Sequence, residues 1–370
     1  MKAEGHPLGF SDTDLNGIDV KTITWALLVV GVVTRLGQYL YNRPFWGDEL
    51  ALIDNLVHRS FIELLAPLDH VQAAPVGFLW LSKLSLMLFG ESTYSMRLIP
   101  LLAGITSIFL FWLLVRRVAP VALPIALGLF VSSNWLIYYA NETKQYSLDV
   151  AIALGLLLLY SHKTRPWVLA LSGAVAVWFS HPAIFVLAGI GFAWLVTAND
   201  KRVVFMVGAV WLTSFVVAYV TLYSKTAASA DLLRYWTYSE RAFIEVNAVS
   251  VVQAVVDSNL MVSGLYQPVL FVLVTLGLVF GIRVAKHDQR LLFLAPVLLT
   301  AFASALHKYP YNSRFILFLV PALTLVTALG LTDIFSTFSL GRRWAYAAMT
   351  TLFLLLPFSQ IDISQNSLFR

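Results

Sequence analysis

The sequence has no cysteine and little charge. Without cysteine, the chain can form no disulfide, no thiolate metal site and no cysteine nucleophile. Charged residues make up 12% of the 370 residues, about half the share in a soluble domain, whereas apolar residues make up 59%. The mean hydropathy is +0.78. This composition excludes an ordinary soluble enzyme and indicates a chain that lies mostly within a membrane.

The apolar residues come in blocks rather than at amphipathic spacing, a pattern typical of bilayer-spanning helices. The blocks cover residues 22–41, 75–89, 96–115, 121–140, 147–161, 166–180, 182–198, 203–223, 267–283, 290–306, 314–333 and 344–358. The first block has no small-residue cleavage site and follows a polar arm that contains several acids. We therefore expect a retained first helix rather than a signal peptide.

Block 75–89 is shorter than the ~20 residues that cross a bilayer, and it carries Lys83 in its middle. If this block lies in the membrane interface, all the basic clusters between spans fall on the cytoplasmic side, where such clusters usually lie. If it spans, clusters such as Arg116-Arg117 and Lys201-Arg202 fall outside. We therefore predict that block 75–89 does not span. Because the net charge of +5 arises from these clusters, it does not indicate nucleic-acid binding.

The expected fold is an all-α polytopic membrane protein with about 11 transmembrane helices. An N-terminal arm, 1–21, would lie in the cytoplasm, and a short tail, 359–370, would lie outside. The membrane domain, 22–358, would carry two large outer loops, 42–95 and 224–266. We find no internal repeat and no separate soluble domain.

The strongest local feature is the pair Asp48-Glu49, directly after the first helix. Adjacent carboxylates at a membrane exit are costly unless they are solvated or paired. In one interpretation they lie in the first turn of a helix at 48–59, where the helix dipole favours acids. In the other, Asp48 faces a water-filled cavity and acts as a general base for a hydroxyl or amine acceptor. The sequence leaves both open.

Further polar residues are expected on the same outer face. Taken singly, each has an ordinary explanation, such as an exposed loop histidine, a snorkelling lysine, an interfacial anchor or a structural ion pair. Their convergence from distant segments favours a site, and arginine is the preferred partner of a phosphate. The candidates are His70, Lys83, Arg97, Glu142, Lys144, Asp149, His181 and Arg314.

The order of these features resembles the GT-C glycosyltransferases, in particular the branch with the protein O-mannosyltransferases and the lipid A aminoarabinose transferases. In that branch an Asp-Glu pair follows the first helix. A His-Pro-Pro-like segment then leads a juxtamembrane helix that ends in Gly-x-Ser, with an Arg at the next helix. The matching residues here are Asp48-Glu49, Asp69-His70, Ala74-Pro75, Gly90-Glu91-Ser92 and Arg97.

Two later segments extend the resemblance, which covers roughly residues 22–335. Residues 142–146, Glu-Thr-Lys-Gln-Tyr, look like the Glu-Ala-Arg-x-Tyr motif of bacterial members, and Asp149 follows Lys144 at the family's spacing of five. Residues 311–315, with Pro321, are similar to the Arg-Tyr-x-x-x-x-Pro start of a late helix in the family.

The resemblance implies an inverting transfer of a monosaccharide from a polyprenyl-phosphate donor to an extracytoplasmic glycan, lipid or protein, in a bacterial inner or plasma membrane. Asp48 would be the general base and Glu49 would support it or bind acceptor. The other implied roles are phosphate binding by Lys83, Lys144 and Arg314, and sugar or acceptor contacts by His181 and Glu142. The clustered acids could hold a divalent metal, but this branch often works without one, and we predict no metal or cofactor.

A transporter or flippase of lipid-linked sugars is the alternative from another class. It would also gather charges in a cavity, but we would expect inverted repeats and broken helices at mid-membrane. Here the charges collect at the outer ends of the apolar blocks. A non-catalytic scaffold with the same fold is a third reading, which the Asp48-Glu49 pair disfavours.

Overall fold

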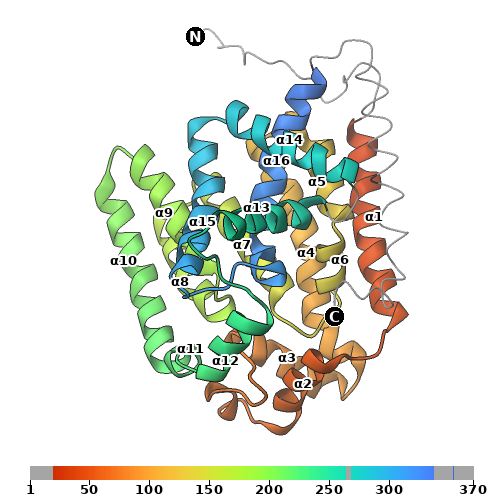
Figure 1. The fold of residues 1–370 in the computed structure, drawn as a ribbon, viewed down its shortest axis with the longest axis vertical. Coiled ribbons are helices and arrows are strands. Elements are labelled where there is room, and N and C mark those ends of the chain that lie inside the picture. Colours follow the sequence, from red (N-terminus) through yellow and green to blue (C-terminus); the bar gives the residue numbers. More distant parts are fainter. Residues whose placement is uncertain (1–19, 264–267, 337–352, 354–370) are drawn as a thin grey trace.

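The computed structural model describes residues 20–263, 268–336 and 353, and within these ranges the chain forms helices and no strand (Figure 1). Four helices are long and apolar enough to cross a membrane: Val20–Tyr41, Thr93–Val118, Lys201–Ala227 and Ser313–Ser336. The predicted all-α integral membrane protein is thus confirmed. The count of about 11 spans stays a prediction, and the expected block 344–358 and tail 359–370 lie outside the described ranges, apart from Phe353.

The membrane bundle begins with α1 (Val20–Tyr41), which packs on α4 (Thr93–Val118) and α5 (Leu123–Ser132). Ser92 starts α4 with a reciprocal cap, because its hydroxyl accepts from the backbone N–H of Ser95 and its own N–H donates to the Ser95 hydroxyl. The helix ends in Arg116 and Arg117, at the terminus where the helix dipole favours cations.

The remaining long helices complete the bundle: α7 (Tyr146–Ser161), α8 (Pro166–Phe179), α9 (Ala183–Thr197), α10 (Lys201–Ala218), α14 (Pro268–Val284), α15 (His287–Ala305) and α16 (Val320–Ser336). Helix α16 is central, and α14 lies directly against it. A Cβ on Gly330 would come within 2.0 Å of the Gly277 carbonyl oxygen. Small residues therefore permit this close backbone approach, as is common between membrane helices.

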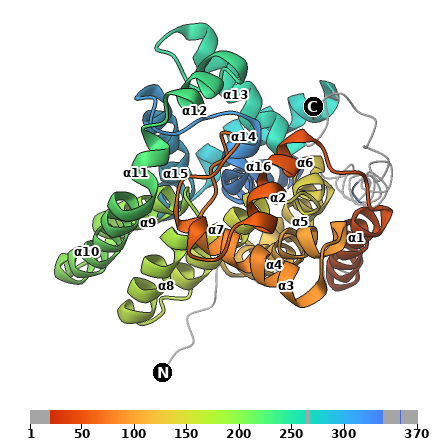
Figure 2. The same cartoon turned by 90° about the horizontal axis from the view of Figure 1, so that it is seen from below.

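Helices α2 (Gly47–His58) and α3 (Val76–Phe89) lie together below the bundle (Figures 1 and 2). They share a small apolar core that includes Leu52, Leu56 and Phe78. Helix α3 also packs on α4 and α8. Block 75–89 is therefore a helix at the end of the bundle, which agrees with its prediction as a juxtamembrane element.

The basic clusters lie at the opposite end from α2 and α3. Arg117 Nε donates to the Ser161 carbonyl at 3.3 Å, and Gln289 Nε2 donates to the Val118 carbonyl at 2.7 Å. These bonds join the ends of α4 and α7 to the start of α15. The turn between α9 and α10 lies at this same end (Figure 1). Within the described ranges, the basic clusters that the sequence assigns to one side thus lie at one end of the molecule.

Two predicted segments differ in the structure. The expected span 121–140 is broken at Ser133 into α5 and α6 (Asn134–Tyr139), and the Ser133 hydroxyl donates to the Met261 carbonyl at 3.2 Å. The expected loop 224–266 contains α13 (Ala248–Ser263), which packs on α14 and α16. The buried side of α13 includes polar residues such as Ser258 and Asn259, whereas valines such as Val249 and Val252 are exposed, so the sequence pattern did not indicate this helix.

Candidate functional site

Asp48 lies in the first turn of α2, whose N-cap is Trp46. The Asp48 side chain therefore does not cap the helix. Its Oδ1 lies 3.0 Å from Lys144 Nζ and accepts from Gln72 Nε2 at 3.0 Å, and its Oδ2 lies 4.0 Å from Arg314 Nη2. The side chain is 20% exposed. Asp48 is thus a partly open carboxylate at the meeting point of three distant segments.

The electrostatic environment keeps Asp48 ionised. Burial alone would raise its pKa, but Lys144 and then Arg314 bring the pKa of Asp48 below its ordinary value. Lys144 comes from the short connection between α6 and α7 and is almost fully buried. Burial lowers the pKa of Lys144, and the Asp48 charge opposes this effect. Lys144 also donates to Gln72 Oε1. The Gln72 amide therefore contacts both Asp48 and Lys144.

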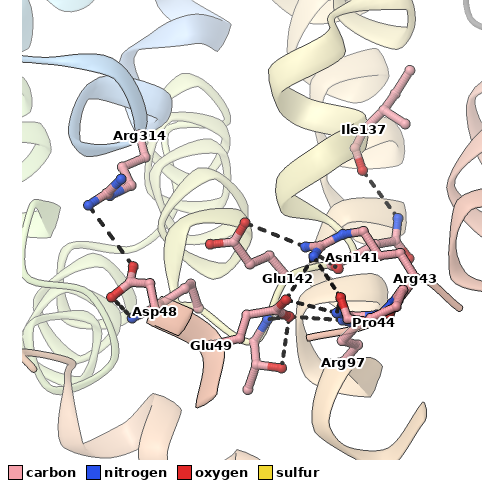
Figure 3. A network of polar contacts seen from close by, with 11 residues as sticks. Arg43, Pro44, Asp48, Glu49, Arg97, Ile137, Asn141, Glu142 and Arg314 are labelled. Carbon is pink, nitrogen blue, oxygen red and sulfur yellow. Dashed lines mark hydrogen bonds and ion pairs between the residues drawn. The ribbon is translucent and has the colours of Figure 1, made fainter. Parts of the chain in front are cut away.

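Arg314 begins the short helical turn Ser313–Leu319 that leads into α16. Its Nη2, the same atom that lies 4.0 Å from Asp48 Oδ2, donates to Glu240 Oε1 at 3.0 Å. Glu240 comes from the segment between α10 and α13, and its Oε1 also accepts from the Tyr235 hydroxyl at 2.7 Å. One guanidinium therefore lies between two carboxylates, as Figure 3 shows for Asp48.

Glu49 points the other way, into a closed ionic network (Figure 3). Its carboxylate is fully buried and accepts from Arg43 Nη1 at 2.9 Å, from Arg97 Nη2 at 2.8 Å and from Arg97 Nε at 2.9 Å. The backbone N–H of Thr143 donates to it at 3.0 Å. Because these donors saturate its oxygens, Glu49 holds the loops in place and does not face a substrate.

Glu142 lies beside this network. Arg43 Nη2 is 3.6 Å from its Oε2, and the side chain is fully buried. Burial and then the Glu49 charge raise the pKa of Glu142 to about 7. Arg97 also donates to the Arg43 carbonyl at 2.7 Å, which fixes the chain between α1 and α2.

The other predicted site residues lie apart from Asp48. His70 is exposed and its Nε2 lies 3.0 Å from Asp54. Lys83 Nζ donates to the carbonyls of Leu56 and Val57, at 2.8 and 3.2 Å. These are carbonyls of the last turn of α2, which has no further turn to satisfy them. The structure thus gives Lys83 a capping contact rather than a phosphate-facing position.

Asp149 and His181 lie inside the bundle. Asp149 is buried in the first turn of α7, beside Ser180. The His181 ring packs against Tyr223, with centroids 4.5 Å apart, and burial lowers its pKa to about 4. A neutral imidazole is therefore expected at physiological pH. Neither side chain has a contact with Asp48 in the described part of the chain.

The sequence interpretation missed four residues of the site: Arg43, Gln72, Thr143 and Glu240. Arg43 precedes Asp48 by five residues, and Gln72 follows His70 by two. Their closeness in the chain to these candidates could have indicated that they belong to the site. Nothing in the sequence sets Glu240 apart from other acids of a long outer segment. Among the residues that the structure describes, no three His, Asp or Glu side chains gather as a metal site.

Comparison with known proteins finds no matching family model and no matching curated sequence. Two solved structures share the fold. The ArnT structure from Cupriavidus metallidurans, in the apo state, has a TM-score of 0.54 and 13% identity over 88% of this chain. The Archaeoglobus fulgidus oligosaccharyltransferase, in complex with Zn and sulfate, has a TM-score of 0.56 and 16% identity over 91%.

This chain spans less than two thirds of either structure, 61% of the first and 52% of the second. Both belong to the GT-C superfamily, as the sequence resemblance predicts. The architecture described above is therefore a GT-C fold, a helical bundle with the segment between α1 and α4 folded across one end.

Proposed function

We propose that this protein is a glycosyltransferase that moves a monosaccharide from a polyprenyl-phosphate donor to an extracytoplasmic acceptor, with inversion and with Asp48 as general base. The observation that supports this most is the environment of Asp48. It is a partly exposed carboxylate kept ionised by Lys144 and Arg314, at the end of a GT-C bundle. One of the two structures that share the fold is an oligosaccharyltransferase by its name.

In the proposed reaction, an acceptor hydroxyl or amine attacks the anomeric carbon of the donor sugar. Asp48 takes the proton of the acceptor as the new bond to the anomeric carbon forms. The bond between the anomeric carbon and the phosphate oxygen breaks, and the electron pair leaves with polyprenyl phosphate. Arg314 and Lys144 stabilise the negative charge that grows on that oxygen. Attack opposite the leaving group inverts the anomeric centre.

The proposed location of the reaction follows from charge. Basic clusters at the ends of α4, α7 and α9 lie at the end of the bundle opposite Asp48. Since such clusters usually face the cytoplasm, the site would face outside, where an envelope glycan, lipid or protein is the acceptor. A bacterial inner or plasma membrane fits this arrangement.

The Asp48→Asn variant tests the proposal. Asparagine keeps the size of the side chain but cannot accept a proton, so we expect sugar transfer from a lipid-linked donor to fall by roughly 10²–10⁴-fold. The variant should still fold, because Asp48 does not cap α2. Asp54→Asn is the matched control: it removes an exposed carboxylate of the same helix and should leave transfer unchanged. Near-normal turnover by folded Asp48→Asn protein would show that Asp48 is not the general base and would favour the transporter alternative.

A further inference from the structure

Glu240 connects the segment between α10 and α13 to the site. Its carboxylate accepts from Arg314 at 3.0 Å and from the Tyr235 hydroxyl at 2.7 Å, and it is 20% exposed. It is the second carboxylate, after Asp48, that contacts the Arg314 guanidinium.

The segment does not need this ion pair to stay in place. The Tyr311 backbone N–H donates to the Ala242 carbonyl at 2.6 Å, and Asn312 Nδ2 donates to the Glu240 carbonyl at 2.9 Å. The Ile244 N–H donates to the Ser304 hydroxyl at 3.0 Å. Residues 242–244 are buried against the bundle. Since the backbone is held on its own, the Glu240 carboxylate is available for another role.

The charges around Asp48 balance without a substrate. Asp48 and Glu240 are negative, Lys144 and Arg314 are positive, and the pairs lie at 3.0 to 4.0 Å. Arg43, Arg97 and the acids they bind form a separate, buried network. An incoming phosphate therefore meets cations whose charge is already neutralised, and it must compete with a carboxylate for them.

The hydrogen-bonding pattern of Arg314 identifies the competitor. Arginine binds a phosphate best through two parallel N–H groups, such as Nε and one Nη. In this structure Nη2 is held by Glu240, whereas the buried Nε has no hydrogen-bond partner in the described ranges. A bidentate phosphate on the Nε–Nη2 edge therefore shares Nη2 with Glu240 and competes with its carboxylate for the charge of the guanidinium.

We infer that Glu240 is an internal anion that occupies Arg314 in the empty enzyme and is displaced by the phosphate of the lipid-linked donor. This inference rests on the proposed function and specifies which group occupies the phosphate-binding arginine before the donor binds. Because Tyr235 donates to the same carboxylate, displacement also breaks this hydrogen bond.

The test measures the affinity for a polyprenyl phosphate in detergent micelles, with the uncharged polyprenol as blank. Glu240→Gln keeps the size and an acceptor oxygen but removes the charge, so the affinity should rise on the order of tenfold. The donor KM should fall by a similar factor with little change in kcat. Glu240→Ser should act in the same direction. Glu245→Gln, an exposed acid of the same segment, makes the same change in net charge and should leave the affinity unchanged.

The same substitution made in Arg314→Gln protein shows whether Glu240 acts through Arg314. In Arg314→Gln protein, the Glu240→Gln substitution should have no effect, because the group for which the two anions compete is gone. If Glu240→Gln protein binds polyprenyl phosphate no more tightly than wild type, the inference is wrong, and Glu240 instead orients Arg314. If the wild-type protein does not distinguish polyprenyl phosphate from polyprenol, the proposed donor class fails first, before any variant is compared.

Discussion

At the residue scale, the site depends on which basic side chains contact each of two adjacent carboxylates. Asp48 and Glu49 are neighbours in sequence, yet Glu49 is fully buried and saturated by arginines, whereas Asp48 is partly open and faces a lysine. Successive residues of a helix point in directions about 100° apart, so the pair faces two environments. The open carboxylate is the chemical candidate, and the buried one fixes the position of its helix.

The Lys144 charge should control the acidic limb of the pH profile. In the wild-type enzyme, kcat/KM is lost as the pH falls through the pKa of Asp48, because the base is then protonated. Burial raises this pKa, and Lys144 lowers it to below the ordinary aspartate value. Lys144→Gln should therefore raise the pKa of Asp48 and move the acidic limb towards higher pH, in addition to any loss in maximal rate.

The measurement is kcat/KM for the lipid-linked donor across the acidic range, in both proteins. Lys308→Gln, which removes an exposed lysine near the same end of the bundle, serves as control and should leave the limb in place. A limb that does not move in Lys144→Gln protein would mean that another group is the base.

At the element scale, the buried network joins four pieces of chain, two of which lie far from Glu49 in sequence. Glu49 belongs to α2, Arg97 to α4, Arg43 to the connection after α1, and Thr143 to the connection before α7. Four elements thus share one carboxylate. The same connection that supplies Thr143 supplies Lys144, so the network sets the position of the lysine that faces Asp48.

Glu49→Gln should destabilise the protein strongly. It leaves two buried guanidinium groups without their carboxylate, and removal of one partner from a buried ion pair costs about 3–5 kcal/mol. We expect a clearly lower melting temperature in detergent, measured alongside Glu91→Gln. Glu91 is an exposed acid of the same outer loop, so its substitution should have little effect. Equal melting of the two variants would contradict a structural role for Glu49.

At the scale of the whole molecule, the fold separates two kinds of charge. Basic clusters gather at one end of the bundle, while the Asp48 site and α2 and α3 lie at the other (Figures 1 and 2). Between them the spans are almost uncharged, apart from residues such as Arg35, which is buried in α1. This polarity supports the proposal that the site faces the outer side of the membrane.

Single cysteines can test this orientation, since the chain has no cysteine of its own. Cysteines at Arg117 and Lys201 should be shielded from a membrane-impermeant thiol reagent in intact cells. Cysteines at Ser92 and Ser224, at the end with the Asp48 site, should be labelled. Permeabilised cells provide the control, in which all four positions become accessible. Labelling of a cysteine at Arg117 in intact cells would show that the proposed orientation is wrong and that the site faces the cytoplasm.

Much of the fold could be predicted from the sequence because its causes are local. A run of apolar residues forms a membrane helix wherever it stands, since every backbone group must be satisfied within the helix. The shortness of block 75–89 and the basic clusters likewise predicted a juxtamembrane helix, and α3 lies at one end of the bundle beside α2 (Figure 1). That α3 does not span stays a prediction. The order of motifs around Asp48 predicted a GT-C fold, which the comparison with solved structures confirms.

The site was determined only by tertiary contacts. The sequence predicted that His70, Lys83 and Arg97 share one outer face with Asp48, but the direction of each side chain decides which residues it contacts. Lys83 faces the last turn of α2 and Arg97 faces Glu49. Glu240, more than 190 residues after Asp48 in the chain, reaches Arg314 because α13 folds back against the bundle. Local patterns fix which helices form, whereas long-range packing fixes which charges meet, because a charge pair depends on distances that no single segment sets.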